Sequence, residues 1–307
     1  MATQPGRPDM SQTLIFSCEG KDHEIALLDL PESPAMRQLQ DWLPAEITIH
    51  CAKIAGCHIY WPSPILAPLE KGADIHSLPP GSFLYYPDRQ YLEIIYDALQ
   101  AETAAVIPLG QLQGDIGWLR DFATRQRKEA GGNTIFSARL SLKGARRPAR
   151  PTPPTDDTSW SRIRRARLAC WNAEPAEITR LLNGSGHNIP FGPMATADGY
   201  YRFVQESLWQ LWNAPDRFAD AARRVAAINA LDLGIARLAH YCHLSDTETV
   251  LNDAIEVIEA GEVPLQDLLA EMILFCSRMS NWVDLHIPWF PANELTKRAL
   301  GRPDLLT

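Results

Sequence analysis

The chain has 307 residues, of which 46% are hydrophobic and 21% are charged, and this balance is typical of a globular protein with two ordinary domains. Its formal net charge of −8 argues against a broad nucleic-acid-binding surface, because such a surface requires a basic excess. We therefore expect a small-molecule ligand and no nucleic-acid partner.

The first segment, residues 1–12, is polar and contains prolines, so it lacks the apolar core of a signal peptide. No run along the chain approaches the roughly 20 apolar residues of a membrane span. The six cysteines include no CxxC pair, which favours reduced thiols over a disulfide framework. We expect a cytoplasmic protein without a membrane association.

The first predicted elements are strands. TLIFSC and EIALLDL predict a hairpin with Gly20 and Asp22 in its turn. Ser33 and Pro34 predict the start of a helix over PESPAMRQLQDWLP. EITIH and CHIYW predict two more strands, and the proline-rich run 62–82 predicts a long functional loop. FLYYPDRQYLEIIYD then predicts two strands about a PDR turn.

Two further strands and one helix complete the first half of the chain. AAVIPLGQL and NTIFSARLSL predict strands, and GDIGWLRDFATRQRKEAGG predicts an amphipathic helix that Gly131 and Gly132 close. Six to eight strands with two helices fit a barrel with helical caps. We therefore predict a β-barrel domain over 11–144.

The composition changes at 145–159, where prolines and arginines predict an extended linker. From Trp160 onward, apolar residues three and four apart predict a helical bundle over 160–307. Glycines and prolines in 185–199 predict a structured loop instead of a helix. The predicted fold class is α+β, with an N-terminal β-barrel followed by an all-α helical bundle.

Titratable residues concentrate between Ile47 and Glu102. Lys53 lies in an apolar strand, where a cation needs either solvent or an anion, and we favour a ligand-facing lysine over an edge-strand lysine. Glu93 and Glu102 are candidate carboxylates for proton transfer, with a solvated position as the alternative for each. Alternation along the strand places Glu93 on the face opposite Tyr96.

Aromatic and basic residues surround these carboxylates in the sequence. Tyr85, Tyr86, Arg89 and Tyr96 form either a plain barrel wall with a solvated arginine or part of a site, and their density favours the site. His187 lies in the 185–199 loop, which could close over the barrel mouth. These residues are candidates by type and density alone.

Motifs for several common chemistries are absent from the sequence. There is no dinucleotide fingerprint, phosphate loop, nucleophile elbow or HExxH. His240 and His243 could bind a metal from one helical face, but a helix C-terminus explains them better. Cys51 and Cys57 adjoin His50 and His58 without zinc-type spacing, which favours buried core thiols. We expect no cofactor.

The stretch ITIHCAKIAG resembles the strand-turn of cyclophilin barrels, and more closely that of a small bacterial cyclophilin-like family reading His-Ala-Arg-x-x-Gly. In that alignment Cys51 replaces the histidine of the family and Lys53 replaces its arginine. PGSFLYYP, EIIYD and PLGQLQGD also resemble this barrel, and the helical half resembles the C-terminus of cucumopine synthase. The whole chain is thus similar to the cucumopine/mikimopine synthase family.

This resemblance implies a cofactor-free Pictet–Spengler condensation of L-histidine, or a related amine, with 2-oxoglutarate or a related oxoacid. By residue type, we expect Glu93 to be the general base, Tyr85 or Tyr96 the proton donor, and Lys53 a catalytic or carboxylate-binding cation. The expected substrate-binding residues are Arg89, His50, Tyr86, Glu102 and His187. We also expect a homo-oligomer.

The sequence leaves two alternative functions to consider. A non-catalytic protein could bind a small dicarboxylate on the same barrel, with the bundle serving assembly. Prolyl isomerase activity is disfavoured, because the arginine that directly follows the histidine of the cyclophilin motif is Cys51 here.

Overall fold

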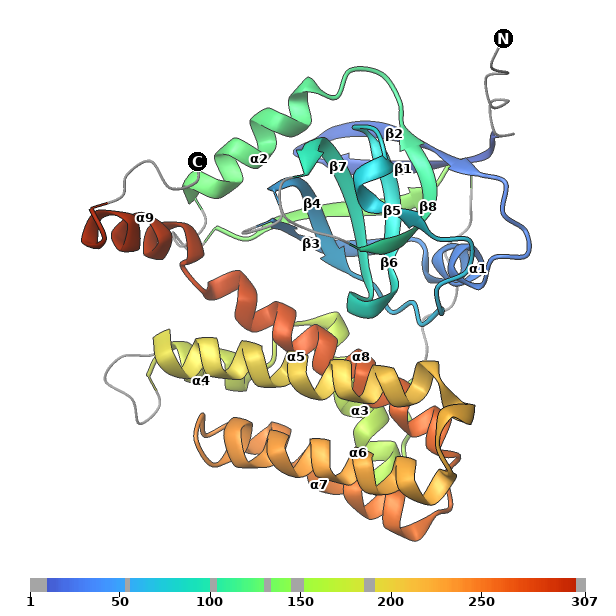
Figure 1. Ribbon diagram of the computed structural model, residues 1–307, viewed down its shortest axis with the longest axis vertical. Coiled ribbons are helices and arrows are strands. Elements are labelled where there is room, and N and C mark those ends of the chain that lie inside the picture. Colours follow the sequence, from blue (N-terminus) through green and yellow to red (C-terminus); the bar gives the residue numbers. More distant parts are fainter. Residues whose placement is uncertain are drawn as a thin grey trace. The chain divides into compact units, whose positions relative to one another are not determined.

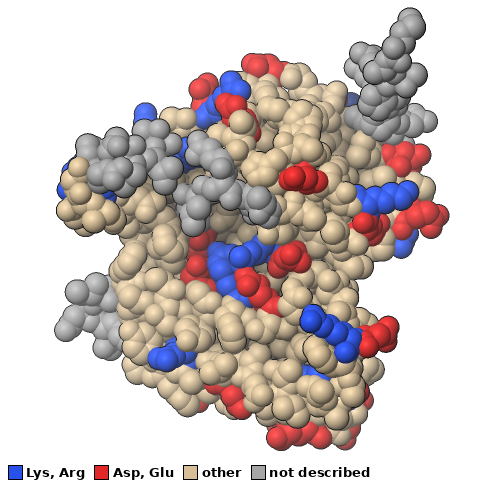
Figure 2. All heavy atoms as spheres, viewed as in Figure 1, with Lys and Arg blue, Asp and Glu red and all other residues tan. Residues whose placement is uncertain are grey.

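The computed structural model describes residues 10–52, 56–99, 104–129, 134–144, 152–184 and 191–301 (Figure 1). Its contacts divide the chain into two units, Met1–Ala149 with Pro288–Thr307, and Arg150–Ile287. None of the described helices combines the length and apolar character that a membrane-spanning helix requires. On the face drawn in Figure 2, the described Lys and Arg side chains are interspersed with Asp and Glu.

Eight strands of the first unit close into an antiparallel barrel, which confirms the predicted α+β class. The barrel runs in the order β2-β1-β9-β3-β4-β7-β6-β8 and closes because β2 also pairs with β8. A two-residue strand, β5, extends the sheet beside β8. The strands are β1 (Met10–Cys18), β2 (Lys21–Leu28), β3 (Ala45–Cys51), β4 (Gly56–Pro62), β5 (Ala73–Asp74), β6 (Ser82–Tyr86), β7 (Tyr91–Leu99), β8 (Ala105–Leu112) and β9 (Phe136–Leu142).

Local sequence signals set the first turns. Gly20 lies in the hairpin turn as predicted, but the placement of Asp22 there is wrong, because Asp22 pairs with Ser17 inside β2. Glu19 and Gly20 both adopt positive φ angles, 51° and 75°, which suits a tight hairpin between β1 and β2. Helix α1 (Pro34–Trp42) begins after Ser33, whose hydroxyl accepts a hydrogen bond from the backbone N–H of Met36 at 3.2 Å. Helix α2 is Gly117–Glu129.

The barrel core is built from the inward residues of the strands and from both helices. Met36 and Leu39 of α1 and Phe122 of α2 belong to this core. The predicted loop 62–82 is not irregular throughout, because it contains β5 and the 3-10 turn Ile75–Ser77. Its first part is held against α1, because the Gln38 side chain exchanges two 2.8 Å hydrogen bonds with the backbone of Leu66. A second buried apolar cluster, on the opposite face of the sheet, consists of Ile75, Leu84, Ile95 and Val106.

The second unit is helical. Its elements are α3 (Ser159–Asn172), α4 (Ala176–Leu182), α5 (Phe191–Asn213), α6 (Asp220–Gly234), a π-helical turn (Ile235–Ala239), α7 (Ser245–Ala260) and α8 (Leu265–His286). Most of α8 is buried from Leu268 to Asp284, which makes it the central helix of this unit. Helix α9 (Trp289–Ala299) groups with the barrel unit.

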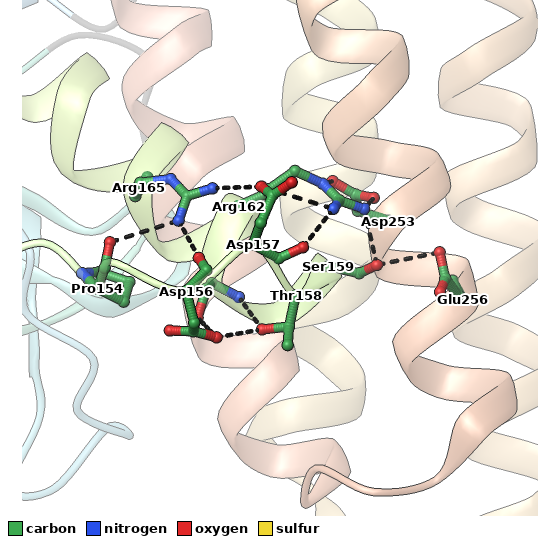
Figure 3. Close-up of polar contacts among 10 residues, drawn as sticks. Pro154, Asp156, Asp157, Thr158, Ser159, Arg162, Arg165, Asp253 and Glu256 are labelled. Carbon is green, nitrogen blue, oxygen red and sulfur yellow. Dashed lines mark hydrogen bonds and ion pairs between the residues drawn. The ribbon is translucent and has the colours of Figure 1, made fainter.

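The start of α3 is fixed by a polar network (Figure 3). Thr158 caps the helix, and Asp156 accepts hydrogen bonds from Thr158 and Ser161, both at 2.7 Å. Arg162 donates two hydrogen bonds to the carboxylate of Asp253 on α7, at 2.9 and 2.5 Å. This bidentate pair ties α3 to α7.

One predicted loop is a helix. Residues 185–190 lie outside the described residues, but 191–199 form the first two turns of α5, so the prediction of a loop over 185–199 is wrong there. Pro193 stands in the first turn, where a missing N–H breaks no helical hydrogen bond. Burial of Pro193, Met194 and Ala197 then offsets the low helix propensity of the glycines in this segment.

Candidate functional site

A row of polar and aromatic side chains crosses three neighbouring strands of the barrel. His50 on β3 lies opposite Tyr60 on β4, and Tyr60 lies opposite Glu93 on β7. Directly paired residues point to the same face, so the three side chains share the face that points away from the barrel core. All three are buried, and Glu93 is only 1% exposed.

Two more residues join this row by alternation along their strands. His58 precedes Tyr60 by two positions and Tyr91 precedes Glu93 by two, so both point to the same face. Nε2 of His58 lies 3.9 Å from Oε2 of Glu93, close enough for electrostatic interaction but beyond hydrogen-bond length. We call His50, His58, Tyr60, Tyr91 and Glu93 the outer-face cluster.

The rings of the outer-face cluster stack. The centroids of His50 and Tyr60 are 5.0 Å apart at an interplanar angle of 22°. Those of Tyr60 and Tyr91 are 4.7 Å apart at 29°. The result is a continuous stack of aromatic rings beside a buried carboxylate, and the edges of such a stack can pack against a heteroaromatic ring.

His58 is electrically neutral at physiological pH. Burial and, to a smaller extent, the positive charge of Arg127 together lower the pKa of His58 to about 4. A neutral imidazole can accept a proton at one nitrogen and donate from the other. A buried carboxylate with such an imidazole beside it can take and pass on a proton.

Tyr85 and Tyr96 point into the barrel core, away from Glu93. The Tyr85 hydroxyl donates a 2.7 Å hydrogen bond to the Ile65 carbonyl, and burial raises its pKa. The Tyr96 hydroxyl accepts a 2.9 Å hydrogen bond from Arg127, and burial raises its pKa to about 12. The role of proton donor stays a prediction for both, and the structure does not bring either to Glu93.

Of the other predicted residues, some lie at the edge of the outer face of the barrel, and the rest lie outside the described residues. Tyr86 ends β6 opposite Tyr91, so it extends the outer face, and Arg89 closes the 3-10 turn Pro87–Arg89 just before β7. That turn is held by Ser63, whose N–H and hydroxyl both donate to the Gln90 carbonyl. The predicted residues Lys53, Glu102 and His187 lie outside the described residues.

The thiol and metal alternatives gain no support from the part of the chain that the structure describes. All six cysteines are free thiols, and burial raises the pKa of Cys57, which disfavours a thiolate nucleophile. His240 lies 3.4 Å from Glu248, and no three His, Cys, Asp or Glu side chains among the described residues are grouped to hold a metal ion.

Sequence reasoning did not assign a role to His58, Tyr60 or Tyr91. Alternation in CHIYW places His58 and Tyr60 on one face of their strand, and alternation in YLEIIY does the same for Tyr91 and Glu93. The missing information was the register between the strands, because only the pairing of Tyr60 with Glu93 brings the two faces together.

The fold defines the class of this protein as an antiparallel β-barrel joined to a helical unit. A solved structure of this class, McbB in complex with tryptophan, has a TM-score of 0.74 to this chain at 18% identity, covering 92% of this chain and 99% of that one. At this identity the similarity establishes the fold. The hypothetical protein AF2241 from Archaeoglobus fulgidus covers 45% of this chain and 98% of its own, at 16% identity and a TM-score of 0.31. No family model and no curated protein sequence matches this chain.

Proposed function

We propose that this protein is a cofactor-independent enzyme that joins an amino acid with a nucleophilic heteroaromatic ring to a 2-oxoacid by a Pictet–Spengler condensation. L-histidine and 2-oxoglutarate are the first pair to test. The observation that carries the proposal is the buried Glu93 beside the stacked rings of Tyr60 and Tyr91. The sequence resemblance to cucumopine/mikimopine synthase and the fold shared with McbB, which was solved with tryptophan, support it.

The reaction balances without a redox partner. The amine nitrogen adds to the ketone carbon of the oxoacid, and loss of water gives an imine. A ring carbon then attacks the imine carbon and forms a carbon–carbon bond, the nitrogen takes up a proton, and the ring carbon loses its hydrogen as a proton. The product equals both substrates minus one water. The protein has to align the ring, bind carboxylates and move protons.

The described residues match these tasks. The stacked rings of Tyr60 and Tyr91 offer apolar edges against which the heteroaromatic ring can pack. Glu93 accepts the proton that leaves the ring carbon, and His58, 3.9 Å away, relays it. Arg89 binds a substrate carboxylate, which guanidinium groups pair with well. Lys53, outside the described residues, is the second proposed cation.

The central experiment incubates the purified full-length protein with histidine or tryptophan and 2-oxoglutarate, without nucleotide or reductant. Mass spectrometry is expected to show a product one water lighter than the summed substrates. Amines deuterated on the ring are expected to lose one deuteron in that product. Binding of the amine without any product would instead favour a binding protein that performs no catalysis.

The matched variants are Glu93→Gln and Glu46→Gln. Glu93→Gln removes the base and is expected to lower kcat at least about 100-fold, the usual contribution of a general base. Glu46 is exposed on the same barrel, 3.8 Å from Arg139, so Glu46→Gln is expected to retain wild-type kcat. Equal kcat in both variants would remove Glu93 from the mechanism.

A further inference from the structure

A solvent-open cavity of about 290 Å³ lies among α3, α4, α7 and α8 of the helical unit. Ala166 and Ala169 line it from one face of α3, and Ala173, the residue that follows this helix, lies beside them in the lining. Their small side chains leave the space that larger residues would fill. Val250 and Phe275 are buried and form an apolar part of the lining.

The lining also holds a buried carboxylate, Glu177, which is 2% exposed. It accepts hydrogen bonds from the backbone N–H of Thr247 at 3.1 Å and from the Thr247 hydroxyl at 2.6 Å. Burial raises the pKa of Glu177, and the two hydrogen bonds from Thr247 lower it by less. A cation bound beside this carboxyl group would favour its ionised form.

The other two carboxylates of the lining already have basic partners. Glu174 lies 2.8 Å from Nε2 of His286, and Asp246 lies 2.7 Å from Arg180. Among the described residues, no Lys, Arg or His nitrogen lies within 4.0 Å of Glu177. The cavity therefore offers a ligand one buried carboxyl group that has no basic partner in the described part of the chain, next to an apolar wall.

We propose that this cavity binds a small apolar monoamine, with its ammonium group on Glu177 and its hydrocarbon part against Val250 and Phe275. A buried carboxylate forms a strong charge-assisted hydrogen bond with such a cation. The volume is at the lower end of ligand pockets, about 300–1000 Å³, so the ligand is small. The carboxyl group of Glu177 disfavours a second carboxylate on the ligand, which separates this ligand from the amino acid proposed as the substrate of the barrel.

The test uses 2-phenylethylamine as the probe and isothermal titration calorimetry of the full-length protein. We expect one bound amine per chain and at least tenfold weaker binding of the uncharged analogue 2-phenylethanol. Glu177→Gln is expected to weaken amine binding at least tenfold. Equal affinities for the amine and the alcohol, or no detectable amine binding, would overturn the proposal.

A second pair of variants tests the place of binding without changing the carboxylate. Ala169→Leu fills the cavity and is expected to abolish binding, whereas Ala176→Leu, an exposed alanine on α4 outside the lining, is expected to leave it unchanged. Glu93→Gln is also expected to leave it unchanged. Amine binding that Glu93→Gln removes and Ala169→Leu retains would assign the amine to the outer-face cluster and refute this site. Product formation, measured separately, decides the proposed function.

Discussion

Glu93 and Tyr96 stand three residues apart on β7 and point to opposite faces of the sheet. Tyr96 joins the barrel core, while Glu93 lies among the rings of the outer-face cluster. The strand period of two residues imposes this separation. Proton transfer involving Glu93 therefore draws on side chains of its own face, and His58, 3.9 Å away, is one such titratable side chain.

The low pKa of His58 makes stability depend on pH. The unfolded chain binds a proton at a pKa near 6.5, whereas folded His58 does so only at about 4. Below pH 6.5 the unfolded state thus holds more protons, and acid favours unfolding. We expect roughly 3 kcal/mol of unfolding free energy from this residue to be lost between pH 6.5 and 4.

Urea titrations at several pH values measure this loss. His58→Asn is expected to flatten the dependence between pH 6.5 and 4, whatever its effect on stability at pH 7. The exposed His76 supplies the control, since His76→Asn is expected to keep the wild-type slope. An unchanged slope in His58→Asn would contradict the burial of a neutral imidazole.

Two substitutions of Tyr60 distinguish a stacking role of its ring from a proton-donating role of its hydroxyl. Its ring stacks between His50 and Tyr91, so Tyr60→Phe keeps the ring contacts and is expected to leave KM for the aromatic amine within about twofold. Tyr60→Leu removes the stacking, worth about 0.5–1.5 kcal/mol, and is expected to raise KM by roughly 2- to 13-fold. A fall in kcat for Tyr60→Phe would instead identify the hydroxyl as a proton donor.

At the level of the elements, glycines have opposite roles in two helices. Gly234 ends α6 where the helices approach closely, and an added Cβ would lie 2.9 Å from the Val204 side chain and 3.3 Å from that of Leu251. Gly199 is exposed in the interior of α5, and an added Cβ would meet nothing within 4 Å. The first glycine permits packing, whereas the second only lowers helix propensity.

The two glycine-to-alanine substitutions are therefore expected to change the stability of the protein in opposite directions. Gly199→Ala is expected to stabilise the protein by about 0.5–1 kcal/mol through helix propensity. Gly234→Ala gains the same propensity, but the crowding is expected to cost about 1–3 kcal/mol and to give net destabilisation. Thermal and urea unfolding measure both, and stabilisation by Gly234→Ala would show that the helices can separate at no cost.

At the scale of the whole molecule, the two units do not simply follow one another along the chain, because the barrel unit includes segments before and after the helical unit. The helical unit spans Arg150–Ile287, and the chain returns to the barrel unit from Pro288. The predicted helical domain over 160–307 therefore includes α9, which groups with the barrel. Independent folding of segments 11–144 and 160–307 stays a prediction.

Limited proteolysis tests that prediction. The proline- and arginine-rich run 145–159 contains exposed, irregular residues before α3, so trypsin is expected to cut there first. Circular dichroism is expected to show mainly strand in the N-terminal fragment and mainly helix in the C-terminal one. A first cut elsewhere, or a strongly helical N-terminal fragment, would contradict this division.

The sequence by itself predicted the elements that depend on neighbouring residues. The β1–β2 hairpin, the cap at Ser33 and the PDR turn follow from local turn and capping chemistry, and the barrel with a helical half follows from the change in hydrophobic period. Alternation also placed Glu93 and Tyr96 on opposite faces. The helix over 191–199 was missed, because burial of its apolar residues outweighed the propensity of its glycines.

Only the tertiary structure decided which residues meet. Strand register brings Tyr60 of β4 opposite Glu93 of β7, and His58 beside them, although Tyr60 and Glu93 are 33 positions apart along the chain. The cavity at Glu177 likewise depends on four helices that no local signal brings together. Local propensity acts over a few residues, whereas a site depends on contacts between distant segments, and packing of the whole chain fixes those contacts.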